Sequence, residues 1–158
     1  MWQRQNNNST PLSTEALLNK ASAYCSRSEH CPQEVADKLR VWGADRQQTE
    51  EVIHRLTDNG FISKERYCRA FVHDKVLFQA WGREKIRAAL AAKRLPSALV
   101  QAALDDIPDE DYAAALQRVI GRKKEELKSE EPAVAADKLK RHLLSRGFTF
   151  GDIEAAGL

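Results

Sequence analysis

The chain has 158 residues, about the length of one ordinary domain or of a few very small ones. Its 42% hydrophobic and 30% charged residues exclude a disordered chain, and no apolar run approaches the roughly 20 residues of a membrane-spanning helix. The net charge is only +2, so a surface for an anionic partner depends on local charge distribution. Three cysteines without a Cys-x-x-Cys pair, and a polar start without a signal-like apolar stretch, predict a cytoplasmic protein.

Apolar residues recur at spacings of three and four, without sustained alternation, and this pattern predicts an all-α fold. We expect residues 1–12, which are rich in Asn and Gln, to be a disordered tail. Three helices follow: Ser13 or Thr14 begins the first, Pro32 begins and Gly43 ends the second, and Asp45 begins and Asn59-Gly60 ends the third. Their expected core residues are Leu17, Ala21, Tyr24, Val35, Leu39, Val52, Ile53 and Leu56.

The middle of the chain predicts three more helices. Ser63 caps a long fourth helix, which we expect Gly82 to end. A fifth helix follows, and Pro96-Ser97 begins a sixth that Pro108 ends. The expected core residues of these three helices are Tyr67, Ala70, Phe71, Phe78, Trp81, Ile86, Leu90, Leu99, Val100, Ala103 and Leu104.

The last third of the chain predicts a seventh, an eighth and a ninth helix. Acidic residues from Asp109 to Asp111 favour the positive end of the seventh helix. Pro132 begins the eighth helix, Gly147 ends it, and Thr149 caps a short ninth. The expected core residues are Tyr112, Ala115, Leu116, Val119, Ile120, Leu139, Leu143 and Ile153.

These helices fall into three repeats of three, spaced about 50 residues apart. The matching positions are Val35, Leu39 and Gly43, then Ile86, Leu90 and Arg94, then Leu139, Leu143 and Gly147. We place the repeats at residues 13–60, 61–107 and 108–158 and expect them to form an elongated tandem array, present as a monomer. Such an array offers a long surface instead of a deep pocket, and therefore favours binding over catalysis.

The residues that carry chemistry form no recognisable catalytic arrangement. The sequence lacks the glycine-rich nucleotide-binding motifs and the Gly-x-Ser-x-Gly motif. Its four histidines are scattered, and we interpret them as solvated surface residues. We therefore expect a protein that is not an enzyme and that has no cofactor or metal site.

Basic residues concentrate in the centre of the chain. Residues 64–94 hold nine Lys and Arg against three Asp and Glu, which marks a surface for an anionic partner. The candidate partner-binding residues are Arg66, Arg69, Lys75, Trp81, Arg83, Lys85, Arg87, Lys93 and Arg94. A solvated helix face with pairs four residues apart is the alternative for the charges, and packing between the fourth and fifth helices is the favoured interpretation of Trp81. A second basic cluster, for which a solvated face is favoured, comprises Arg118, Arg122, Lys123 and Lys124.

The run from Phe61 to Lys75 resembles the signature of the RecX regulatory proteins. It has an aromatic residue after Gly60, a short polar turn, an Arg-aromatic-small sequence, and then Phe-Val followed by a basic residue. The block from Trp81 to Leu90 is similar to the next block of that family. The resemblance covers residues 14–158 and is strongest between Val52 and Leu90. Lys93 and Arg94 depart from it, because many relatives have a glycine-bearing turn there.

This resemblance implies a modulator of the RecA recombinase. Members of the family are tandem three-helix-repeat proteins that bind the groove of the RecA–DNA filament, and they usually block its extension and depress its ATPase and strand-exchange activities. Single- or double-stranded DNA within the filament is a further expected contact. The alternative is a general DNA-binding helical module without a recombinase partner, which the basic segment and the paired helices would also suit.

Overall fold

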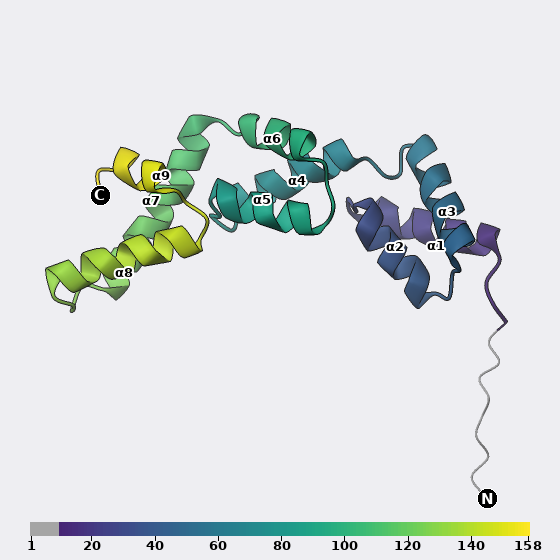
Figure 1. Ribbon diagram of the computed structural model, residues 1–158, viewed down its shortest axis with the longest axis horizontal. Helices are drawn as coiled ribbons and strands as arrows, with labels where there is room; N and C mark the ends of the chain where they lie inside the picture. The colour runs from purple at the N-terminus through teal and green to yellow at the C-terminus, as the bar shows by residue number, and fades with distance from the viewer. Residues whose placement is uncertain (1–9) are drawn as a thin grey trace, which may run out of the picture. The chain divides into compact units, whose positions relative to one another are not determined.

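The computed structural model describes residues 10–158, which form nine α-helices and no β-strand (Figure 1). In chain order they are α1 (Thr14–Arg27), α2 (Pro32–Val41), α3 (Arg46–Asp58), α4 (Lys64–Leu77), α5 (Arg83–Ala92), α6 (Ser97–Asp105), α7 (Asp109–Glu126), α8 (Pro132–Ser145) and α9 (Phe150–Ala155). The predicted all-α fold is confirmed for these residues. Most of the tail expected at 1–12 lies outside the described part of the chain.

The chain divides into two compact units, one ending at Ser63 and the other running from Lys64 to Leu158. The first unit contains α1–α3, and the second contains α4–α9. The repeat boundaries at residues 60 and 107 stay a prediction.

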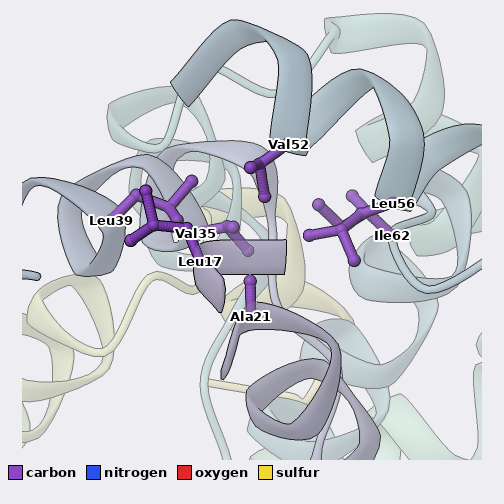
Figure 2. Close-up of a cluster of buried hydrophobic side chains, with 7 residues drawn as sticks. All are labelled: Leu17, Ala21, Val35, Leu39, Val52, Leu56 and Ile62. Atoms are coloured by element: carbon purple, nitrogen blue, oxygen red, sulfur yellow. The ribbon is translucent and has the colours of Figure 1, made fainter. Parts of the chain in front are cut away.

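The core of the first unit is built from pairs of apolar residues four positions apart. Each helix contributes one such pair, and Ile62 completes the cluster (Figure 2). The buried side chains are Leu17, Ala21, Val35, Leu39, Val52, Leu56 and Ile62. Tyr24 and Ile53, which were expected in the core, are partly buried against this cluster. Burying each of the Leu, Val and Ile side chains contributes about 1.5–3 kcal/mol.

Side-chain caps fix several helix starts where the sequence predicts them. The Ser13 hydroxyl accepts a hydrogen bond from the Ala16 N–H at 3.1 Å. The Asp45 carboxylate accepts from the Gln48 N–H at 2.8 Å, while the Gln48 side chain accepts from the Asp45 N–H at 3.1 Å. Thr149 begins α9 with the same reciprocal arrangement. These bonds satisfy backbone N–H groups that a helix leaves without internal partners.

The second helix of each group of three ends in the same way. Gly43, Arg94 and Gly147 follow α2, α5 and α8, and their φ angles are +86°, +60° and +94°. The next residue then donates its N–H to the carbonyl five positions back: Ala44 to Leu39 at 3.0 Å, Leu95 to Leu90 at 3.2 Å, and Phe148 to Leu143 at 3.1 Å. This is the Schellman cap, which favours glycine because a side chain is strained in the left-handed region. The three positions that match in the sequence thus share one backbone conformation.

The fourth helix is shorter than the sequence suggests. α4 ends at Leu77, well before Gly82. Ala80 has a φ of +51°, which no residue within a right-handed helix adopts. Trp81 therefore lies in the turn after α4 and not on the helix.

The core prediction is wrong at several positions in the second unit. Ala70 and Phe78 are exposed, the latter by 72%, while Phe71, Trp81 and Leu99 are only half-buried. The buried positions of α4 are Tyr67, Cys68, Val72 and Val76. Cys68, Val72 and Val76 are four residues apart and form one buried stripe along the helix. Ala70 and Phe71 lie on the same helix but outside this stripe.

Within the second unit, the turn before α5 packs its backbone directly against the turn after α8. The Gly82 N–H donates to the Arg146 carbonyl at 2.8 Å, and the Glu84 N–H donates to the Gly147 carbonyl at 3.0 Å. A β-carbon placed on Gly82 would stand 2.2 Å from the carbonyl carbon of Gly147. Glycine is required there because the two backbones touch.

Tyr112 of α7 reinforces this joint. Its hydroxyl accepts a hydrogen bond from the Arg83 N–H at 3.1 Å and donates one to the Asp152 carboxylate at 3.0 Å. Burial is the main reason why the pKa of Tyr112 rises to about 12, and the neighbouring Asp152 adds to the increase. The hydroxyl therefore stays protonated and links the start of α5 to α9.

Candidate partner-binding surface

The nine candidate residues all lie in the second unit. Arg66, Arg69 and Lys75 belong to α4, and Trp81 lies in the turn that follows. Those on or directly after α5 are Arg83, Lys85, Arg87, Lys93 and Arg94. Their local surroundings divide them into three groups.

The first group is a cluster around one indole ring. The ammonium nitrogens of Lys75 and Lys85 lie 4.8 and 4.3 Å from the centroid of the half-buried Trp81 ring. The Phe71 ring meets the indole edge-on, with 6.3 Å between centroids. Cations at this distance are attracted to the negative face of an aromatic ring. The structure thus joins three of the candidates, separated by up to ten positions in the sequence, into one positively charged site.

The second group consists of arginines that the protein pairs internally. The Arg83 guanidinium lies 3.7 Å from the centroid of the Tyr112 ring, and its nitrogens lie 3.8 and 3.9 Å from the carboxylates of Asp109 and Asp152. The Arg83 side chain is only 30% exposed. Its position therefore supports the joint within the second unit.

Arg69 and Arg87 are paired as well, but at more exposed positions. Arg69 meets the carboxylates of Glu65 at 2.8 Å and Asp106 at 3.4 Å. Arg87 pairs with Glu84 and donates to the Gln101 side chain at 3.0 Å. Exposed pairs of this kind contribute about 0–1 kcal/mol, so a partner can compete for these side chains at small cost.

The third group comprises Arg66, Lys93 and Arg94. Arg66 and Arg94 are exposed, and Lys93 is half-buried. Among residues 10–158, Arg94 has no hydrogen bond or ion pair from its side chain. Arg94 is therefore the most directly available of the nine.

The second basic cluster has a structural task that the sequence does not reveal. Arg118 donates to the carbonyl oxygens of Val76 at 3.3 Å and Leu77 at 2.7 Å, at the end of α4. Arg146, which is not among the candidates named from the sequence, donates to the carbonyls of Gln79 and Ala80. A cation near the C-terminal carbonyls of a helix is favourable because these groups carry partial negative charge.

Residues 10–158 bring together no group of three or more His, Cys, Asp or Glu side chains that could hold a metal ion. In the same range, no helix combines the length and the apolar composition that crossing a bilayer requires.

The nine helices of residues 10–158, with the same cap after the second helix of each group of three, define a protein built from consecutive three-helix domains. Sequence models of the first, second and third three-helix domains of RecX match residues 18–56, 65–104 and 109–156. The chain therefore belongs to the RecX family.

Individual relatives agree with this assignment. A protein of Prosthecochloris aestuarii named Regulatory protein RecX is 29% identical over 135 residues, which cover 85% of this chain and 87% of the relative. A protein of the same name from Oceanobacillus iheyensis is 24% identical over 131 residues, and there the match spans 47% of the relative's length. The crystal structure of RecX from Lactobacillus salivarius has the same fold, with a TM-score of 0.78 at 22% identity over 90% of this chain and 92% of that one.

Proposed function

We propose that this protein binds the filament that the RecA recombinase forms on DNA and restrains its extension, its ATP hydrolysis and its strand exchange. The observation that carries the proposal is the charge of the second three-helix domain. Residues 64–94 contain nine Lys and Arg but only three Asp and Glu. A nucleoprotein filament is polyanionic, and a local excess of positive charge favours its approach. The relatives' name, a regulatory protein, fits a chain that acts by binding.

The proposal assigns different tasks to the candidate residues. Arg66, Arg94 and the Lys75–Trp81–Lys85 cluster contact the filament directly, either its protein or the DNA inside it. Arg69, Arg87 and Lys93 add charge at the edges of this surface. Arg83 keeps the surface in place through its contacts with the joint. The protein acts in the cytoplasm as a monomer.

The decisive experiment is a titration of this protein into RecA assembled on single-stranded DNA, with ATP hydrolysis as the readout. We expect sub-stoichiometric amounts to slow hydrolysis, because blocking a growing filament end affects many subunits. Unchanged hydrolysis and filament length at an equimolar ratio would refute the proposal.

A charge-reversal variant tests the assigned surface. The double substitution Arg66→Glu and Arg94→Glu changes two exposed side chains. We expect half-inhibition to need about tenfold more protein, because like charges would then face the filament. The matched control is the double substitution Arg40→Glu and Arg46→Glu in the first unit, whose side chains are 73% and 92% exposed. Equal loss in the control would mean that net charge matters and the assigned surface does not.

A general DNA-binding module is the second candidate, favoured by the same basic excess. It requires equally tight binding to bare DNA and a steep decrease in affinity with salt. Firm capture by the filament, with weak binding to DNA alone, would exclude it.

A further inference from the structure

A cavity outside the proposed filament surface lies where α7 and α8 meet the turn after α4. Its volume is about 250 Å³. The lining residues are Phe78, Gln79, Ala80, Arg118, Val119, Arg122, Lys123, Glu126, His142 and Arg146. All belong to the second compact unit, so the cavity is formed within one body.

The cavity carries more positive than negative charge. Three arginines and one lysine line it against a single carboxylate, Glu126, which already pairs with Lys123 at 3.1 Å. Within the described chain, Arg118 and Arg146 donate only to backbone carbonyls, which carry no net charge. Arg122 is exposed, and no carboxylate within residues 10–158 pairs with it. Three guanidinium groups thus share one cavity whose single carboxylate pairs with Lys123.

The histidine in the cavity wall also reports the positive charge of its surroundings. Burial and the nearby Lys123 and Arg146 lower the pKa of His142, while Glu126 only partly opposes them. The imidazole therefore senses positive potential from the same residues that line the cavity.

Phe78 adds an aromatic surface to the cavity. Its ring lines the cavity and is nevertheless 72% exposed. An exposed aromatic ring next to cationic side chains offers a stacking face for a base beside a site for its phosphate. Because ligand cavities usually hold about 300–1,000 Å³, this one suits a phosphate with part of its sugar better than a whole nucleotide.

We propose that this cavity binds a single nucleotide unit, with the phosphate between Arg118 and Arg122, Arg146 behind it, and the base outside against Phe78. Arginine suits this task because its planar group donates two parallel hydrogen bonds to a phosphate. The unit is either a free nucleoside monophosphate or an unpaired nucleotide in a DNA strand. The site stands apart from the proposed filament surface and does not depend on RecA.

The test uses the full chain without RecA and four probes: inorganic phosphate, thymidine monophosphate, a short oligothymidylate and polyglutamate. Calorimetry measures affinity, and the His142 ring resonances report occupancy in NMR spectra. We expect a bound phosphate to raise the pKa of His142, since it offsets Lys123, Arg146 and the other cations facing it. Tighter binding of the oligonucleotide identifies a strand as the source, and equal binding identifies the free nucleotide. Absence of nucleotide binding at low salt, or equally tight binding of polyglutamate, overturns the proposal.

Two pairs of variants locate the ligand. Arg122→Ala should weaken both phosphate and nucleotide binding by about tenfold, as expected for a lost charge-assisted hydrogen bond. Its control is Arg141→Ala on α8, whose side chain is 76% exposed and outside the cavity. Phe78→Ala should weaken nucleotide binding about fivefold or more and leave phosphate binding unchanged. Its control is Phe150→Ala, an aromatic residue that is 69% exposed. Equal effects within either pair place the ligand elsewhere and refute the assignment.

Discussion

The glycine contact in the second unit allows a quantitative test. Gly82→Ala introduces a β-carbon 2.2 Å from one backbone atom of Gly147 and 2.3 Å from the Phe148 nitrogen. Since Gly82 has a φ of −78°, alanine is not strained by its own backbone, and the cost comes from the contact alone. The two turns must separate, which weakens the hydrogen bonds donated by the N–H groups of Gly82 and Glu84.

The expected loss of stability is the sum of the weakened hydrogen bonds and the overpacked contact. Two backbone hydrogen bonds contribute about 1 kcal/mol each, and overpacking costs about 1–3 kcal/mol. We therefore expect Gly82→Ala to lower the free energy of unfolding by about 3–5 kcal/mol. Urea denaturation followed by circular dichroism measures this loss, and faster amide exchange at Glu84 assigns it to the joint.

Two other glycines serve as controls for the same substitution. Gly121 lies within α7 with nothing within 4 Å of an added β-carbon, so alanine should stabilise by about 0.5–1 kcal/mol. Gly43 has the same open space but a φ of +86°, so alanine there should cost about 1 kcal/mol through backbone strain. A loss below 1 kcal/mol for Gly82→Ala would show that the turns do not touch and would refute the reasoning.

Three further predictions concern the same unit. Arg94→Gly should stabilise the protein by about 0.5–1 kcal/mol in urea denaturation, because the left-handed φ of +60° is then unstrained; a loss of stability would contradict this. Tyr112→Phe removes two hydrogen bonds and should cost about 1–2 kcal/mol, measured in the same way. The pKa of Tyr112 is about 12 in the folded protein, against an ordinary value of 10.0. The stability that this shift contributes is therefore complete below pH 10 and is lost as the pH rises through 12. A tyrosine absorbance titration in which every tyrosine ionises near pH 10 would contradict this. Arg83→Ala should lower the melting temperature more than Arg87→Ala, because only Arg83 stacks on Tyr112; equal changes would count against a structural task for Arg83.

Local signals in the sequence account for most of the helical architecture. Capping residues such as Ser13, Asp45 and Thr149, together with the spacing of four between apolar residues, set helix starts and inward faces through contacts within one turn. The core prediction fails in α4 and in the turn after it, where aromatic residues outweigh the regular stripe, and Phe78 in that turn is exposed. Hydrophobicity alone does not indicate whether an aromatic side chain in a short turn packs into the core or faces solvent.

Whether a basic residue is paired within the protein depends on contacts between residues far apart in the sequence. Arg83 meets Asp152 and Arg146 meets the Ala80 carbonyl across stretches of more than sixty residues. Net charge over a segment could identify the second domain as basic, but it could not separate an arginine committed to a joint from an available one such as Arg94. Only the tertiary arrangement makes that distinction.

The contact between Gly82 and Gly147 is made by main-chain atoms, so no change of side-chain rotamer can relieve crowding there. Any larger residue at either glycine pushes the two turns apart. In this chain the two positions therefore fix the angle at which the second and third three-helix domains meet.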